Sequence, residues 1–330
     1  MKIFVTGGTG FIGRRVVKRL RCSGHDLRCL ARKTSDLGPL RDAGAEVVIG
    51  DVTDAASVAR AAEGCGWVVN LANLFELWVR DRRQYRAVNV AGTRNVMKAA
   101  LAAGADKVVH VSTVTVYGQT AWPIREDSPL GTRCATEYAR SKREGDAVAW
   151  ALYREEGLPL VVVMPGGVLG AGDPKAGGRF VEGVAHHRAP ARICTRHPFA
   201  WVHVDDVALA IDRALEKPGN IGQAYMIVGE SMTFSEFYRL ISEVSGVPLP
   251  ILALPDWLAT AGAHACTVLA SLTGKPPLLD LSVDQVALMR QGFIADGGKA
   301  ARELGLAYTP IRRALEDEIG PPASRGVPGR

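Results

Sequence analysis

The sequence predicts an α/β fold in which a doubly wound parallel sheet carries a smaller, discontinuous α+β lobe. Three observations support this prediction. Apolar, β-branched runs alternate with helical patterns through the first half of the chain, as in parallel βαβ units. A glycine-rich turn joins the first of these runs to the first helical pattern. The alternation breaks near residue 165, where Gly and Pro accumulate.

The composition suits two domains, or one α/β domain with a substantial appendage. The chain has 330 residues, is 47% hydrophobic and carries a formal net charge of +6. No basic run interleaves with aromatic residues, so we expect no nucleic-acid partner. The six cysteines form no C-x-x-C pair, and the chain opens directly on a strand-like run. Both features indicate free thiols in a cytoplasmic protein.

The elements of the first half follow one another with short links. Each strand is a continuous apolar run, which is typical of strands buried on both faces. We expect strands at residues 2–6, 26–31, 46–50, 67–72, 107–112 and 158–164. Helical patterns lie between them at residues 12–21, 55–62, 88–103 and 137–156.

The second half is less regular. The glycine- and proline-rich residues 165–178 predict a loop, after which the runs 201–216 and 223–229 are expected to return to the sheet. Thr233 and Glu236 have capping-box spacing, which predicts a helix. The resulting division assigns 1–165 plus about 199–229 to the sheet domain, 166–198 plus 230–320 to the lobe, and 321–330 to a disordered tail.

The longest mostly apolar stretch is residues 257–272, WLATAGAHACTVLASL. It is short for a membrane span and contains polar residues, so we expect no stable membrane insertion. A buried or interface helix is the favoured interpretation, with contact to a membrane surface as the alternative.

The turn VTGGTGFIG has the spacing of a dinucleotide-binding loop. Gly8, Gly10 and Gly13 satisfy G-x-G-x-x-G, and Gly7, Gly10 and Gly13 satisfy the looser G-x-x-G-x-x-G. Such glycines let the backbone approach a pyrophosphate at a helix N-terminus. An ordinary glycine-rich turn is the alternative, but the position between the first strand and the first helix favours a Rossmann domain that binds NAD(P).

Basic residues follow the second expected strand, where NAD-binding domains often carry an acidic residue. Ala31 leaves room there, and Arg32 and Lys33 could hold the 2′-phosphate of NADP; the alternative is that both are exposed loop cations. After the third strand, Asp51 is assigned to the adenine amino group and Asp54 to helix capping.

Tyr138 and Lys142 lie four residues apart, so on a helix they share one face. A nearby ammonium favours phenolate and lowers the tyrosine pKa from its usual value of about 10. Such a pair supplies a general acid/base and the group that tunes it. Y-x-x-x-K also arises by chance, but Ser112 and Thr113 offer hydroxyls at the end of the preceding strand, where open α/β sheets bind ligands.

These motifs, together with YRAVNVAGTRNV, VSTVTVYG and HVDDVA, resemble the extended short-chain dehydrogenase/reductase family from Met1 to about Gly320. The chain is most similar to the dihydroflavonol-reductase-like branch, which includes hopanoid-associated sugar epimerase-like proteins. The resemblance implies that Thr113, Tyr138 and Lys142 are catalytic, with Ser112 on the opposite face of its strand. It implies cofactor contacts from Gly7, Gly10, Phe11, Ile12, Gly13, Arg32, Lys33, Asp51, Val52, Leu71, Ala72, Tyr138, Lys142, Pro165 and Val168.

Three functions remain open on this basis. The first is NADPH-dependent reduction of a ketone or aldehyde, with Tyr138 as the acid and NAD as a possible substitute cofactor. The second is epimerisation or dehydration of a nucleotide sugar with NAD, although VMPGGVLGAGD lacks the family's R-x-x-N-x-Y-G-P pattern. The third is a non-catalytic NAD(P)-binding regulator. The sequence does not name the substrate.

The same resemblance implies a homodimer formed through the helices at 88–103 and 137–156. His186 and His187 are adjacent and would diverge, so we expect no metal site. Asp205 and Asp206 are expected to cap or pack, and Asn89 to be a structural polar residue.

Overall fold

A computed structural model of the chain describes residues 1–320, so the predicted disordered tail lies outside the described residues. Seven parallel strands form the main sheet in the order β3-β2-β1-β4-β5-β6-β9. The strands are β1 (Lys2–Thr6), β2 (Asp26–Ala31), β3 (Glu46–Ile49), β4 (Trp67–Asn70), β5 (Lys107–Val111), β6 (Leu160–Pro165) and β9 (Ala224–Ile227). The predicted doubly wound sheet is confirmed.

Helices cover both faces of this sheet, and each face has its own core. Side chains alternate along β1, so that Ile3 and Val5 join one apolar cluster and Phe4 joins the other. The first cluster includes residues of α1 (Phe11–Cys22) and α8 (Val204–Glu216). The second includes residues of α3 (Ala55–Ala62), α5 (Thr93–Ala102) and α6 (Glu137–Glu156).

Local signals explain where the predicted helices begin and end. α6 begins at Thr136, whose hydroxyl accepts a hydrogen bond from Ala139 N at 3.0 Å, and it ends at Gly157 in the left-handed region. The capping box predicted from Thr233 and Glu236 is present at the start of α9 (Phe234–Ser245). These caps supply partners for backbone groups that the helix itself leaves unpaired.

The helix expected at 88–103 begins earlier than the sequence indicated. α4 (Arg83–Arg86) runs into a π-helical turn, η1 (Ala87–Gly92), and then into α5. The π turn holds Asn89, which is buried, accepts from Leu74 N and donates to Ser141 Oγ. Asn89 is therefore the structural polar residue that the sequence suggested.

The smaller lobe contains a second sheet of three strands in the order β10-β8-β7. These are β7 (Gly167–Leu169), β8 (Pro198–His203) and β10 (Glu230–Thr233). Two expectations were wrong here: residues 165–178 include a strand, and the strand before α8 joins this sheet instead of the main one. The glycines serve close packing, because a Cβ on Gly167 would lie 2.6 Å from the Trp201 ring.

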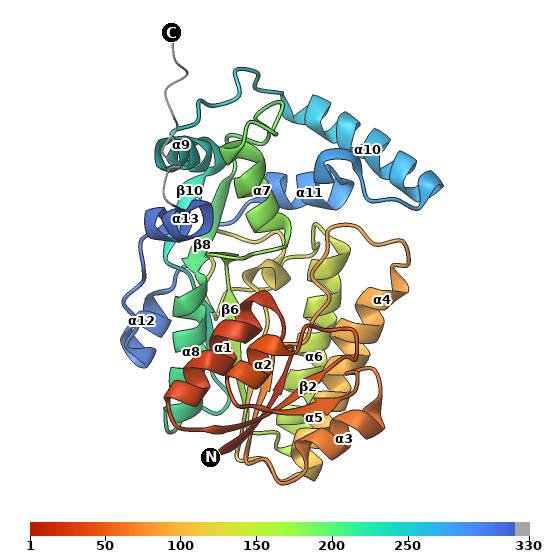
Figure 1. The fold of residues 1–330 in the computed structure, drawn as a ribbon, viewed down its shortest axis with the longest axis vertical. Helices are drawn as coiled ribbons and strands as arrows, with labels where there is room; N and C mark the ends of the chain where they lie inside the picture. Colours follow the sequence, from red (N-terminus) through yellow and green to blue (C-terminus); the bar gives the residue numbers. More distant parts are fainter. Residues whose placement is uncertain (321–330) are drawn as a thin grey trace.

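Within residues 1–320, five helices and a short 3₁₀ turn complete the lobe. A further helix, α12, is not one of these five and packs on α8 and β9 of the main domain. The helices of the lobe are α7 (Ala176–Ala185), α9, α10 (Asp256–Thr273), α11 (Val283–Gln291) and α13 (Ile311–Ile319), and the remaining elements are η3 (Leu278–Asp280), α12 (Gly298–Leu304), α2 (Gly38–Asp42) and η2 (Val114–Tyr117). Figure 1 shows α10 at the margin of the molecule with α11 beneath it.

The apolar run at 257–272 forms α10, and of the two favoured interpretations, a buried or an interface helix, the structure excludes the buried one. Trp257 is 71% exposed and Leu272 is 80% exposed. Among residues 1–320, no helix combines the length and the apolar character that crossing a membrane requires.

Candidate active site

The glycine turn lies at the carboxyl end of the main sheet, between β1 and α1. Gly7 has a positive φ of 70°, and a Cβ on it would lie 2.7 Å from Ala72 N, so only glycine lets the turn approach the end of β4. A Cβ on Gly13 would lie 2.1 Å from Gly7 O. α1 then starts at Phe11 with no side chain capping it, which leaves amide groups available to a phosphate. The turn therefore fits a dinucleotide pyrophosphate.

The end of β2 is small and basic. Ala31 is buried, whereas Arg32 and Lys33 are exposed. Neither cationic side chain has a hydrogen-bond partner within residues 1–320, so both can reach a ligand. Asp51 Oδ1 accepts from Thr53 N at 2.9 Å and from Thr53 Oγ1 at 2.8 Å. Asp54 caps α3 by accepting from Ala56 N, as the sequence indicated.

Thr113, Tyr138 and Lys142 come together where β5 ends and α6 begins. All three are buried. Burial raises the pKa of Tyr138, the negative charge of Asp146 raises it further, and a hydrogen bond with Thr113 lowers it. Burial lowers the pKa of Lys142, whose Nζ donates to Val111 O at 2.8 Å. The pKa of Tyr138 is thus raised from its usual value, not lowered as the sequence suggested, because burial outweighs the stabilising contacts.

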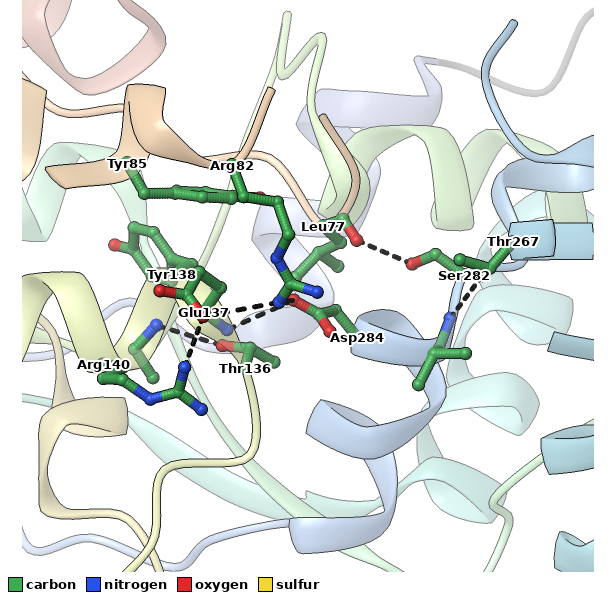
Figure 2. A network of polar contacts seen from close by, with 12 residues as sticks. Leu77, Arg82, Tyr85, Thr136, Glu137, Tyr138, Arg140, Thr267, Ser282 and Asp284 are labelled. Carbon is green, nitrogen blue, oxygen red and sulfur yellow. Dashed lines mark hydrogen bonds and ion pairs between the residues drawn. The ribbon is translucent and has the colours of Figure 1, made fainter. Parts of the chain in front are cut away.

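Phe75 closes one side of the tyrosine and was missed in the sequence. Its ring meets that of Tyr138 edge to face, with the ring centroids 4.8 Å apart. The segment that carries Phe75 is fixed at both ends, because Asn89 binds Leu74 and Ser282 Oγ donates to Leu77 O at 2.9 Å (Figure 2). An aromatic residue in a segment without helical or strand periodicity gave no signal of this contact.

The lobe is joined to the start of α6 beside the tyrosine. Asp284 of α11 accepts a hydrogen bond from Glu137 N at 3.2 Å, and Arg82 lies within 3.8 Å of the same carboxylate (Figure 2). A pocket of about 430 Å³ opens between the segment after β4 and the segment after α10. Its lining includes Leu77, Trp78, Pro277, Ser282 and Gln285.

A chain of buried hydrogen bonds runs beneath the site, across three strands. Thr6 Oγ1 donates to Asn70 Oδ1 at 2.7 Å, so the Asn70 amide is free to donate to His110 Nδ1 at 3.1 Å. His110 Nε2 then carries the proton and donates to Asp146 Oδ1 at 3.1 Å. Ser112 Oγ donates to the other oxygen of Asp146 at 2.5 Å.

Both oxygens of Asp146 therefore accept hydrogen bonds from this network. Burial and the charge of Lys142 lower the pKa of His110, which keeps the imidazole neutral. Asp146 lies one helical turn beyond Lys142, and its charge raises the pKa of that lysine. The sequence signal was available: an acidic residue four positions after Lys142, and polar residues ending the runs WVVN and KVVH.

The structure thus brings most of the predicted positions to one edge of the main sheet. Leu71 and Ala72 follow β4 beside Gly7, and Pro165 ends β6. Val168 lies in β7, and Val52 O accepts a hydrogen bond from Asn95 Nδ2.

The remaining polar candidates are structural. Asp206 accepts hydrogen bonds from Thr309 N and Oγ1, which confirms it as a packing group. His186 and His187 are exposed at the end of α7. Within residues 1–320, no group of three or more His, Cys, Asp or Glu side chains is placed to hold a metal ion.

Comparison with known proteins agrees with this geometry. Residues 3–228 match the model of the NAD dependent epimerase/dehydratase family. The chain is 29% identical to a putative dihydroflavonol 4-reductase of Synechocystis, over 96% of this chain and 93% of that protein. It is 29% identical to sterol demethylase protein B of Methylococcus capsulatus, over 99% and 100%. The crystal structure of gox2253 superposes with a TM-score of 0.82 at 33% identity, covering 96% of both chains.

Proposed function

Because the chain belongs to the NAD-dependent epimerase/dehydratase family of extended short-chain dehydrogenases/reductases, we propose that it reduces a ketone or aldehyde to an alcohol with NADPH. The observation that carries this proposal is that Tyr138 is buried together with Thr113 and Lys142 where β5 ends and α6 begins, in surroundings that raise its pKa. A protonated phenol is the form that donates a proton, as carbonyl reduction requires.

Each residue has a separate part in this reaction. The nicotinamide, when bound, supplies the hydride. Thr113 donates a hydrogen bond to the carbonyl oxygen, and Tyr138 delivers its phenolic proton to the same atom. Lys142 stabilises the phenolate that remains, because an ammonium close to a phenolate favours the charged form. Phe75 shields the tyrosine from water on one side.

The preference for NADPH rests on Arg32 and Lys33. A guanidinium binds a phosphate through two parallel hydrogen bonds, and Ala31 leaves room for it. Charge-assisted bonds of this kind correspond to roughly 10- to 100-fold in affinity. Arg32 is exposed, so we expect the lower end of this range.

We further propose that the substrate is largely apolar. The names of two relatives, a dihydroflavonol reductase and a sterol demethylase protein, refer to polycyclic compounds. The pocket after β4 is lined in part by Leu77, Trp78 and Pro277, which suit such a surface. Its charged lining residues, Glu76, Arg80, Arg179 and Asp280, would meet polar groups of the compound. Epimerisation of a nucleotide sugar is the second candidate, because the family's name includes it.

The test combines cofactor titration with a panel of carbonyl compounds. NADPH and NADH are titrated against the wild type and Arg32→Ala, with Arg60→Ala on α3 as a matched exposed arginine. We expect the wild type to prefer NADPH and Arg32→Ala to lose that preference. Equal affinities in the wild type would remove the cofactor argument. Tightly held NAD that is not exchanged, with no net NADPH oxidation, would favour the epimerase.

Tyr138→Phe tests the acid directly. It should lower turnover of a confirmed substrate by roughly 10²- to 10⁴-fold and leave NADPH affinity unchanged. A variant with near-full activity would show that the proton comes from another group.

We also propose a homodimer that pairs α5 and α6 of the two subunits. Sedimentation velocity at micromolar concentration should show a dimer, and a monomer alone would contradict it.

A further inference from the structure

The side of α10 that faces water carries large apolar side chains, and the side that packs on the protein carries small ones. After Asp256, none of its residues is charged. The residues that it buries are small, Ala259, Ala263 and Ala270. Its large apolar side chains are exposed instead: Trp257, Leu258, Val268, Leu269 and Leu272. We call these five side chains, with the preceding Ile251 and Leu252, the α10 face.

A surface helix normally turns its large apolar residues inward and its charged residues outward. Here the small residues allow α10 to lie close to α11, and the large residues face away from the protein. The loop before the helix also exposes large apolar side chains, since Ile251 is 97% exposed and Leu252 is 57% exposed. Contiguous exposed apolar surface on a folded protein marks a site of interaction.

The charges at the border of this face are positive and uncompensated. Arg80 packs against Gly274 at the C-terminal end of α10, and Lys275 follows it; both are exposed. Neither is within ion-pair distance of a carboxylate in the part of the chain that the structure describes. The border carboxylates are already paired, Asp256 with His197 at 2.7 Å and Asp280 with Arg179.

We propose that the α10 face docks on the surface of an anionic lipid bilayer. The helix would lie in the plane of the interface, with Trp257 and the leucines at the boundary between headgroups and acyl chains. Arg80 and Lys275 would meet lipid phosphates. A bilayer fits better than a symmetric pairing of the α10 face with its own copy, because the border carboxylates that such a copy would offer these cations, Asp256 and Asp280, already have partners.

Docking in this way has a consequence for substrate entry, and this part rests on the proposed function. Pro276 and Pro277 follow α10 after two residues and line the pocket that also contacts Leu77 and Trp78. A docked α10 would therefore hold the pocket close to the membrane surface. An apolar carbonyl compound dissolved in the bilayer would reach Tyr138 with less exposure to water.

The test measures lipid binding without any substrate, so it does not depend on the proposed reaction. The full-length chain is sedimented with vesicles of phosphatidylcholine alone and of phosphatidylcholine mixed with phosphatidylglycerol. We expect binding to the mixed vesicles, and a loss of at least about 10-fold in Trp257→Ser/Leu272→Ser. Arg80→Ser/Lys275→Ser should lose roughly 10- to 30-fold on the mixed vesicles only.

Ile49→Ser/Ile221→Ser is the matched control, because both residues are exposed isoleucines in other parts of the fold. It should bind vesicles like the wild type. Retained NADPH binding in every variant shows that each is folded. No binding of the wild type to mixed vesicles, or equal binding by the α10 variant, would overturn the proposal. So would a wild-type oligomer that dissociates in the α10 variant, since the face would then join copies of this chain.

Discussion

Replacing Asp146 by asparagine keeps the shape of this buried side chain and removes its capacity to carry a negative charge. The carboxylate accepts hydrogen bonds from His110 Nε2 and Ser112 Oγ. The asparagine oxygen can still accept from His110, and its amide can donate to Ser112, whose hydroxyl rotates. What the substitution removes is the negative charge that raises the pKa of Lys142.

The effect on stability follows from these two hydrogen bonds. Bonds to a charged group contribute about 1.5–3 kcal/mol each and neutral bonds about 1, so the pair should lose about 1–4 kcal/mol. At about 2.1 cal/mol/K of unfolding entropy per residue, a chain of 330 residues should melt about 1–6 °C lower. If Lys142 is deprotonated in the folded variant, it gains a proton when the chain unfolds at any pH below the ordinary lysine pKa. The unfolded state then binds more protons than the folded state, so the stability of the variant should rise with pH.

Two opposite changes then reach Tyr138. Loss of the Asp146 charge lowers the pKa of Tyr138 directly. Deprotonation of Lys142 should raise that pKa, because a nearby ammonium favours the phenolate. At 1.5 Å per residue, Lys142 is about 6 Å and Asp146 about 12 Å from Tyr138 along the helix axis. Because Lys142 is the nearer of the two along the helix, we expect its effect to prevail. We expect reduction at neutral pH to slow by about 10-fold and to recover at lower pH, where Lys142 regains its proton.

The assay is the pH dependence of NADPH oxidation with a confirmed carbonyl substrate, together with thermal unfolding. Asp212→Asn is the control, because Asp212 is equally buried and accepts hydrogen bonds from Arg19 and Ser23 on the opposite face of the sheet. It should lower the melting temperature and leave the pH profile unchanged. An Asp146→Asn enzyme with the rate and pH profile of the wild type would refute this reasoning.

Three further predictions use other parts of the structure. Gly13→Ala should weaken NADPH binding by roughly 10-fold in calorimetry, because its Cβ would lie 2.1 Å from a backbone oxygen. Gly183→Ala is the control, because open space surrounds Gly183, and it should bind NADPH like the wild type. Equal NADPH affinities for Gly13→Ala and the wild type would contradict the role of the turn. Burial raises the pKa of Tyr138, so the rate of reduction should be independent of pH below about 10. The rate of the reverse oxidation, which needs the phenolate, should rise with pH. A reduction rate that falls between neutrality and pH ~9 would be inconsistent with this prediction. Burial raises the pKa of Cys29 to about 12, so iodoacetamide should label the exposed Cys22 in the folded protein and reach Cys29 only after unfolding, as mass spectrometry of peptides can show.

The sheet and the glycine turn could be predicted because their signals are local. A run such as KIFVT predicts a buried strand by itself, and the glycines that follow it predict a turn. The membership of β8 in the second sheet could not be predicted in this way. It depends on the close approach of Gly167 to Trp201, two residues far apart in the sequence.

The polar network shows the same limit within the site. Asn70 and His110 each end an apolar strand, and only the pairing of β4 with β5 places them in contact. Asp146 meets them because α6 packs over β5 and β6. The exposure of α10 was also beyond the sequence, since an apolar run does not reveal whether its large side chains or its alanines face the protein.

The place of β9 beside β6 has a consequence for biosynthesis. The chain leaves the sheet at Pro165 and returns only at Ala224–Ile227, after building β7, α7, β8 and α8. From 165 to 227 the ribosome adds 62 residues, which takes about 3–12 s at 5–20 residues per second. During that time the outer edge of β6, with its run of valines, lacks its final partner. An unpaired apolar edge invites association between nascent chains, so the yield of folded protein should depend on how quickly translation passes through this segment.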